Sequence, residues 1–366
     1  MYLKMKNNHM TAFPAHLLSR IDIRHLMAHK CGIETVDQAA FAGHEEGLET
    51  IDFSDNKFSQ IPSLALRNLT GLVSLNLNFN LISTLEANAF TGLASLLRLS
   101  LYGNRIVTVS PASFLGVGVN LTRINLGGNQ LATVPTEAIR PLIALQRLQL
   151  QENSIRGPLS SGDFARLGSA ASLDVLNLAN NEISRLEEGL FAGLESINSL
   201  DFEVNRIAVI DDAAFRGIEE TLEWLKLGEN QLTAVPHAAL ANLTKLRELD
   251  LRGNLISKVG AKDFAGYGVN IKFLVPHAAL ANLTKLRELD LRGNLISKVG
   301  ASDFAGYGVN IKFLYLQKNR IDSIEAGAFD QLHSLEWLNL HSNQLKHLPA
   351  VVFERALSKI LILDVH

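Results

Sequence analysis

Residues able to do chemistry occur throughout this chain, but their spacing matches no catalytic pattern. The sequence holds 11 histidines and one cysteine, Cys31. It lacks H-E-x-x-H, G-x-S-x-G and a glycine-rich phosphate loop, the patterns that place a metal, a nucleophile or a phosphate. A single cysteine also excludes a disulfide scaffold and a zinc site built from cysteines. The sequence therefore predicts a protein that is not an enzyme and that needs no cofactor and no metal.

The most regular polar residues are asparagines, which recur mostly every 24 or 25 residues. The chain is expected to bend at these positions, which leaves backbone donors and acceptors free inside the fold. An amide side chain donates and accepts, so it satisfies both kinds of group, and we interpret the series as structural. Cys31 holds the same position in the first repeat, as either a buried thiol or a reactive one. The series is Asn56, Asn80, Asn104, Asn129, Asn153, Asn181, Asn205, Asn230, Asn254, Asn294, Asn319 and Asn343.

The asparagines belong to a longer repeat that runs through the chain. Leu72-x-x-Leu75-x-Leu77-x-x-Asn80-x-Ile82-x-x-Leu85 recurs in the same frame, with repeats beginning at 23, 48, 72, 96, 121, 145, 173, 197, 222, 246, 271, 286, 311, 335 and 360. The segment x-x-Leu-x-Leu alternates apolar and polar residues, which predicts a strand with one buried face. Long connections make successive strands parallel. A phenylalanine usually follows five residues later, and we expect these rings to form core.

This frame resembles the leucine-rich repeat family, and in particular its typical 24-residue extracellular class. The 25-residue variants, such as Phe215-Arg-Gly-Ile-Glu-Glu-Thr-Leu222, are similar to those of chaoptin. The resemblance implies an α/β repeat solenoid, a horseshoe with a parallel β-sheet on its concave face and an irregular or short-helical convex side. It implies this fold for residues 23–366, with residues 1–22 as a partial N-terminal segment.

Two irregularities interrupt the repeat. Residues 235–274 and 275–314 are near-duplicates that differ only at Lys262 and Ser302. Their junction leaves a truncated coil at 271–285, where we expect a local defect that splits the stack into two blocks. The family's cysteine-bearing caps are also missing, and the chain ends within an expected strand without a C-terminal cap. We therefore expect this sequence to be a fragment of a longer protein.

Composition limits the partners. The formal net charge is −3, whereas a nucleic-acid binder normally carries a basic surplus, so nucleic acid is not expected. No apolar run reaches the roughly 18 residues of a membrane span. The first 20 residues lack the apolar stretch of a signal peptide. Because the resemblance implies an extracellular or cell-surface protein, we presume that a signal peptide is missing, with a cytoplasmic location as the alternative.

Side chains on the concave face are the candidates for binding a protein ligand, because tyrosine, tryptophan and arginine are common in interface hot spots. The candidates are Tyr102, Gln149, Gln151, Glu203, Trp224, Lys226, Arg252, Arg292, Tyr315 and Trp337. The first repeat is basic, with Arg24, His25, His29 and Lys30, and forms either a solvated face or a contact for a glycan or acidic partner. N-glycosylation sequons begin at Asn68, Asn120, Asn242 and Asn282.

These features predict a non-catalytic, protein-binding solenoid. The resemblance implies a role in adhesion or extracellular matrix organisation. One alternative is a receptor ectodomain for signalling or innate immunity. A second is an intracellular scaffold or a non-catalytic subunit of an enzyme.

Overall fold

The computed structural model describes residues 1–366 except 118, 260–282, 307, 349, 354–358 and 366. The chain coils in successive turns, and nearly every turn contributes one short parallel strand, so the predicted repeat solenoid is confirmed. The turns divide into two units. The first comprises Met1–Arg156, Asp163–Asn181 and Gly193–Ser196, and the second comprises Gly157–Gly162, Glu182–Ala192 and Ile197–His366.

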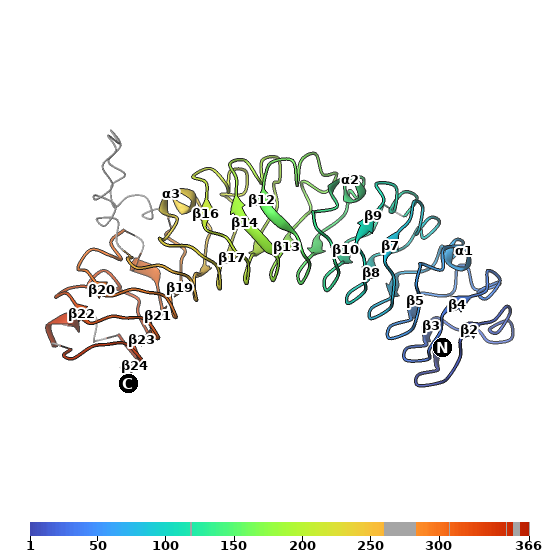
Figure 1. The fold of residues 1–366 in the computed structure, drawn as a ribbon, viewed down its shortest axis with the longest axis horizontal. Helices are drawn as coiled ribbons and strands as arrows, with labels where there is room; N and C mark the ends of the chain where they lie inside the picture. The colour runs from blue at the N-terminus through green and yellow to red at the C-terminus, as the bar shows by residue number, and fades with distance from the viewer. Residues whose placement is uncertain (118, 260–282, 307, 349, 354–358, 366) are drawn as a thin grey trace. The chain divides into compact units, whose positions relative to one another are not determined.

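In the first unit, the sheet strands lie side by side in chain order (Figure 1). Their register is constant, so that Leu75 lies beside Leu99, and Leu99 beside Ile124. Because side chains alternate between the two faces of a strand, this register stacks equivalent positions of each repeat into columns. The strands are β1 (Tyr2–Lys4), β3 (His25–Met27), β5 (Thr50–Asp52), β6 (Ser74–Asn76), β8 (Arg98–Ser100), β10 (Arg123–Asn125), β11 (Arg147–Gln149) and β13 (Val175–Asn177).

The second unit repeats this arrangement. Its sheet strands are β15 (Ser199–Asp201), β17 (Trp224–Lys226), β18 (Glu248–Asp250), β19 (Glu288–Asp290), β21 (Phe313–Tyr315), β23 (Trp337–Asn339) and β24 (Ile362–Asp364). The expected split of the stack at the truncated coil is wrong. Strand β18 pairs directly with β19, so the two near-duplicate segments place identical strands next to each other. Most of the coil at 271–285 lies outside the described residues.

The core is formed by the frame positions of the repeat. In the turn that begins at Leu72, the side chains of Leu75, Leu77, Ile82 and Phe90 are at most 1% exposed. The phenylalanines stack along the core, as Phe90 does on Phe114 with ring centroids 5.7 Å apart. The predicted core role is thus confirmed for the described members of the series, which are Phe41, Phe90, Phe114, Phe164, Phe191, Phe215, Phe304, Phe329 and Phe353.

The asparagines form a ladder of amide groups inside each unit, which we call the asparagine ladder. Nδ2 of Asn104 donates to the carbonyl oxygens of Leu77 and Leu101, both at 2.9 Å. Its Oδ1 accepts the N–H of Ile82 from the preceding turn at 3.2 Å. Each amide therefore satisfies backbone groups of its own turn and of the turn before it, as the sequence predicts.

The start of the chain adds a turn that the frame did not predict. Strand β1 pairs with β3, and Phe13 and Leu18 are fully buried. Asn8 takes the ladder position, where its Nδ2 donates to the carbonyl of Met5 at 2.6 Å. The thiol of Cys31 donates to the same carbonyl (S···O 2.8 Å) and is 1% exposed, which confirms the buried alternative for this cysteine.

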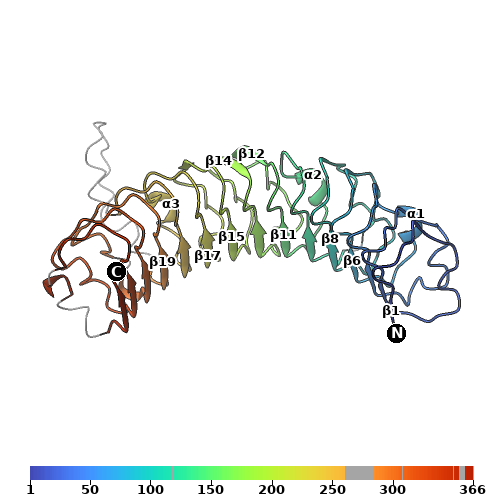
Figure 2. The ribbon, with the colours of Figure 1, turned by 60° about the horizontal axis from the view of Figure 1, so that its bottom comes forward.

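The side of the turns opposite the sheet is built from short elements (Figure 2). In the described part of the chain, three one-turn helices each follow a proline whose φ lies near −80°, namely α1 (Ser63–Leu66), α2 (Thr136–Ile139) and α3 (His237–Leu240). Within the described residues, 3₁₀ helices span Gly308–Asn310 and Ala350–Phe353. Away from the main sheet lie β2 (Ala12–Phe13), β4 (Thr35–Val36), β7 (Thr84–Leu85), β9 (Thr108–Val109), β12 (Arg156–Leu159), β14 (Glu182–Leu186), β16 (Val209–Ile210), β20 (Lys298–Val299) and β22 (Ser323–Ile324).

Candidate binding face

The side of the parallel sheet that faces away from the core is the candidate surface, and we call it the sheet face of each unit. Three columns of side chains cover it. The first column holds the first residue of each strand, the central column holds the third, and the last column holds the residue two positions beyond the strand. The residue between the first two columns points into the core, as Leu225 does at 0% exposure.

The structure places every predicted candidate on a sheet face, but in two groups. Tyr102, Gln149 and Gln151 belong to the first unit. The second unit holds the others, with Trp224 and Trp337 in the first column, Lys226 and Tyr315 in the central column, and Glu203, Arg252 and Arg292 in the last column. Among the aromatic candidates, Trp224 is exposed, at 37%, whereas Tyr102, Tyr315 and Trp337 are half-buried.

An ion-pair network ties together the last column of the second unit. Arg252 pairs with Glu203 and with Asp250, whose Oδ1 also accepts the N–H of Arg252 at 2.9 Å. To reach Glu203, the arginine crosses the turn that carries β17, where Gly228 stands in the same column. A Cβ at position 228 would lie 3.1 Å from both Cγ of Arg252 and Oδ1 of Asp250. The missing side chain at Gly228 therefore gives Arg252 the space to cross.

Two pairs of carboxylates face each other where the near-duplicate strands meet. The register of β18 and β19 sets Asp250 beside Asp290 and Glu248 beside Glu288. Both aspartates are nearly buried, at 5% and 6% exposure. Nε of Arg292 contacts Oδ2 of Asp290 at 2.9 Å, which partly offsets the repulsion. Like charges directly opposite on neighbouring strands destabilise a sheet, so the second unit carries a local electrostatic cost here.

The environment of these carboxyl groups changes their protonation. Burial raises the pKa of Asp250 from 3.8 to about 6, and the Asp290 carboxylate acts in the same direction. Burial also raises the pKa of Asp290 and of Glu288, and Glu248 adds to the effect on Glu288. Burial, with the nearby Glu288 and Asp290, raises the pKa of the Tyr315 hydroxyl. Because Asp250 loses its proton near pH 6, the net charge of the second unit's sheet face becomes more negative as the pH rises through this value.

In the first unit, the side chain of Tyr102 is fixed by a hydrogen bond. Its hydroxyl donates to Oε2 of Glu152 at 2.7 Å, and this bond raises the pKa of Tyr102. The ring passes over Gly127, where a Cβ would lie 3.0 Å from Cδ2 of Tyr102. Phe79 packs against the same ring edge-on, with centroids 5.4 Å apart. Tyr102 and Phe79 thus form a small aromatic surface beside β8.

Two groups on the sheet faces were not predicted from the sequence. The first is the carboxylate pairing of β18 and β19, which follows only from the direct pairing of these strands. The second is a run of arginines, Arg98, Arg123 and Arg147, in the first column of the first unit. The signal for the second group was present in the sequence, because each arginine immediately precedes the buried strand residue of consecutive repeats.

The basic residues of the first repeat have neighbours in the structure. Nη1 of Arg24 contacts Oε1 of Glu49 at 3.3 Å, and the ring of His25 stacks on Tyr2 with centroids 4.2 Å apart. Nδ1 of His29 lies 3.7 Å from Oδ2 of Asp52. These contacts favour a solvated edge with local partners over a surface reserved for a glycan.

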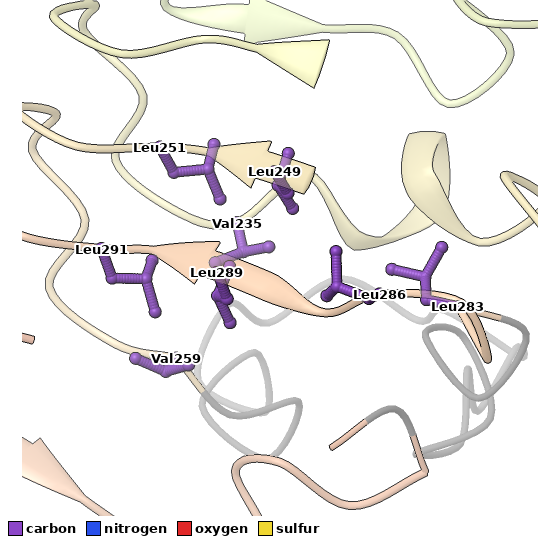
Figure 3. Close-up of a pocket in the computed structure, with 8 residues that line it drawn as sticks. All are labelled: Val235, Leu249, Leu251, Val259, Leu283, Leu286, Leu289 and Leu291. Carbon is purple, nitrogen blue, oxygen red and sulfur yellow. The ribbon is translucent and has the colours of Figure 1, made fainter. Parts of the chain in front are cut away.

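In the described part of the chain, no three or more histidine, cysteine, aspartate or glutamate side chains are arranged so that they could hold a metal ion. The same part contains no helix that is long and apolar enough to cross a membrane. One small core cavity, of about 10 Å³, lies behind β18 and β19 (Figure 3). Its lining is entirely aliphatic, so it offers no group for chemistry, and it consists of Val235, Leu249, Leu251, Val259, Leu283, Leu286, Leu289 and Leu291.

Comparison with known proteins bears on the family. One leucine rich repeat model matches residues 70–118, 200–256, 220–267 and 309–364, and two further leucine rich repeat models match residues 282–305 and 47–69. Together these matches cover more than half of the chain.

Three curated relatives illustrate the likeness. Human "Leucine-rich repeats and immunoglobulin-like domains protein 1" is 32% identical over 147 residues, which are 40% of this chain and 13% of that protein. Lumican of Coturnix japonica is 33% identical over 141 residues, 38% of this chain and 39% of lumican. Chaoptin of Drosophila melanogaster is 24% identical over 161 residues, 38% of this chain and 12% of chaoptin, which agrees with the resemblance seen in the 25-residue repeats. The chain therefore spans well under two thirds of each of these proteins.

Solved structures share the fold. Toll in the Drosophila Toll–Spatzle complex superposes with a TM-score of 0.63 at 22% identity, over 94% of this chain and 40% of that one. The Leptospira interrogans leucine-rich repeat protein LIC12759 gives a TM-score of 0.61 at 19% identity, over 98% of this chain and 94% of its own. At these identities the likeness shows the solenoid fold alone.

The raised pKa of Asp250 gives a testable dependence of stability on pH. The folded state holds a proton on Asp250 up to about pH 6, whereas the unfolded chain releases it near 3.8. The folded state therefore binds more protons between these values, and this group lowers the free energy of unfolding as pH rises from about 4 to about 6. We expect Asp250→Asn to reduce this pH-dependent loss of stability. The measurement is the free energy of unfolding in urea at several pH values.

The matched control is Asp212→Asn, which changes an exposed carboxylate on the same unit. It should keep the pH dependence of the original chain. If both variants showed the same slope between pH 4 and 6, Asp250 would not be protonated in the folded state.

Proposed function

Because the chain belongs to the leucine-rich repeat family, we propose that it is a non-catalytic, protein-binding solenoid that acts outside the cell or at its surface. Its role would be in adhesion or in the organisation of extracellular matrix. The frame positions of each turn are used by the core and by the asparagine ladder. Function is therefore left to the side chains of the sheet faces, which vary from turn to turn.

The observation that carries the proposal is the sheet face of the second unit. Trp224 remains 37% exposed there, on a strand that is paired on both sides, with β15 and with β18. The guanidinium of Arg292 is also accessible, with its side chain 44% exposed. Trp337 lies in the same column as Trp224 and is half-buried. Tryptophan and arginine side chains contribute most to protein interfaces.

The extracellular part of the proposal rests on the relatives and on the sequons. Lumican, a matrix protein, is among the similar proteins. Asn68, Asn120 and Asn242 are all exposed, as an acceptor of N-glycan must be, while Asn282 lies outside the described residues. Toll, whose solenoid superposes on this chain, is seen in complex with Spatzle. A protein ligand is thus compatible with this architecture.

Binding can be tested with the whole chain, secreted from eukaryotic cells and screened against a panel of secreted and cell-surface proteins. We expect Trp224→Ala combined with Arg292→Ala to weaken binding of a captured panel member by about tenfold or more, since both residues are of hot-spot type. The measurement is the dissociation constant by surface plasmon resonance, with the melting temperature recorded for each variant.

The control combines Val209→Ala with Arg216→Ala, which removes an exposed apolar and an exposed basic side chain of the second unit away from its sheet face. It should leave the affinity unchanged. Equal affinities for both double variants, or a panel without any binder, would contradict the proposal.

Glycosylation gives an independent test of location. We expect the secreted chain to carry glycans at Asn68 and Asn120, so that glycosidase treatment lowers its apparent mass and Asn68→Gln removes one step of the shift. Asn198→Gln, outside any sequon, should change nothing. A chain that passes through the secretory pathway without glycan at either site would favour the intracellular scaffold.

A further inference from the structure

Three arginines form a column on the sheet face of the first unit. Arg98, Arg123 and Arg147 are the first residues of β8, β10 and β11, and the strand register places each directly beside the next. Their neighbours along the strands, such as Ile124 and Leu148, are buried, so the arginines point away from the core. All three are exposed. We call them the arginine column.

No acidic side chain of the described residues forms an ion pair with this column. None of the three guanidinium groups takes part in an ion pair among the described residues, although many other arginines of the chain do. The adjacent central column carries only the neutral residues Ser100, Asn125 and Gln149. The carboxylate of Glu152 accepts a hydrogen bond from the Tyr102 hydroxyl and pairs with none of the three arginines. Three positive charges thus stand together in a chain whose formal net charge is −3.

The fold does not require this arrangement. Elsewhere in the first unit the same column also holds uncharged residues, such as Thr50, Ser74 and Val175. Like charges directly opposite on neighbouring strands destabilise a sheet, so three adjacent arginines lower the stability of the free protein. A ligand that supplies negative charge would remove this repulsion, which links the column to binding rather than to folding.

We propose that the arginine column binds an acidic segment of a protein partner. Neighbouring strands lie about 4.8 Å apart, so one carboxylate placed between two arginines can accept hydrogen bonds from both. Guanidinium groups bind carboxylates in a bidentate manner, which lysines cannot do. The inference rests on the proposed function in one respect, namely that the partner is a protein.

The surroundings of the column favour a protein over another polyanion. The amides of Asn125 and Gln149 can donate to and accept from peptide groups. Phe79, 51% exposed, and Tyr102 provide an aromatic surface on the turns of β6 and β8, on the other side of the central column. Aromatic residues beside arginine, with uncharged polar groups between them, are the composition of a protein interface. A sulfated polysaccharide or a nucleic acid would need only the charges.

The test uses the full chain and a fluorescein-labelled peptide that contains glutamate and tyrosine, followed by fluorescence anisotropy at low and physiological salt. We expect the triple variant Arg98→Gln, Arg123→Gln, Arg147→Gln to weaken binding at least about tenfold and to flatten its salt dependence. The control triple, Arg67→Gln, Arg105→Gln and Arg166→Gln, makes the same change of charge at exposed arginines of the first unit. It should bind like the original chain.

Equal weakening by both triples would mean that net charge alone governs binding, and would overturn the proposal. So would the absence of peptide binding, or binding of heparin through the column without binding of the peptide. The column variant should melt at a temperature no lower than the original, because it removes repulsion; a lower temperature would assign the arginines to folding. Peptide binding through the column, with no panel protein bound at the other sheet face, would sustain this inference while the proposed function fails.

Discussion

The buried backbone at each bend of the coil is the constraint on which the rest of the structure depends. Every turn leaves peptide groups inside the stack that water cannot reach, and such groups are costly unless they are paired. The asparagine ladder pairs them. Because each amide bonds both to its own turn and to the preceding one, it fixes where one turn sits on the next, as Asn104 does between Ile82 and Leu101. The strand register follows from this link.

A fixed register makes the surface a set of columns, and the chemistry of a column is decided by which repeats stand next to each other. In the first unit, three consecutive repeats begin their strands with arginine, and the result is an unpaired basic column. In the second unit, the near-duplicate segments bring Asp250 beside Asp290, with arginines folded over them. Both features arise from ordinary side chains at variable positions, and neither disturbs the frame beneath.

Periodicity predicted the fold because each frame position has one physical task. Leucines and phenylalanines recur where the core needs apolar side chains, and asparagines recur where the bend needs hydrogen-bonding groups. The structure places them at the positions that the repeat predicts. Residues 1–22 were missed as a turn because Met5 and Phe13 replace the usual leucines of the frame, although Asn8 keeps the asparagine. The pairing of β18 with β19 could not be predicted, because counting residues through the truncated coil suggested an interruption. The ion pairs of Arg252 depend on the space above Gly228, which a one-dimensional pattern does not contain.

The most direct measurement of the asparagine ladder is amide hydrogen exchange resolved to single residues. Three backbone N–H groups outside any strand donate hydrogen bonds to Oδ1 of a ladder asparagine at 2.9–3.2 Å. They are those of Ile82 to Asn104, Ile106 to Asn129 and Ile207 to Asn230. We predict that they exchange as slowly as the strand amides of Leu99 and Leu225, because the same cooperative stack must open in both cases. Exchange as fast as that of exposed turn residues would contradict the ladder as the link that holds the turns in register.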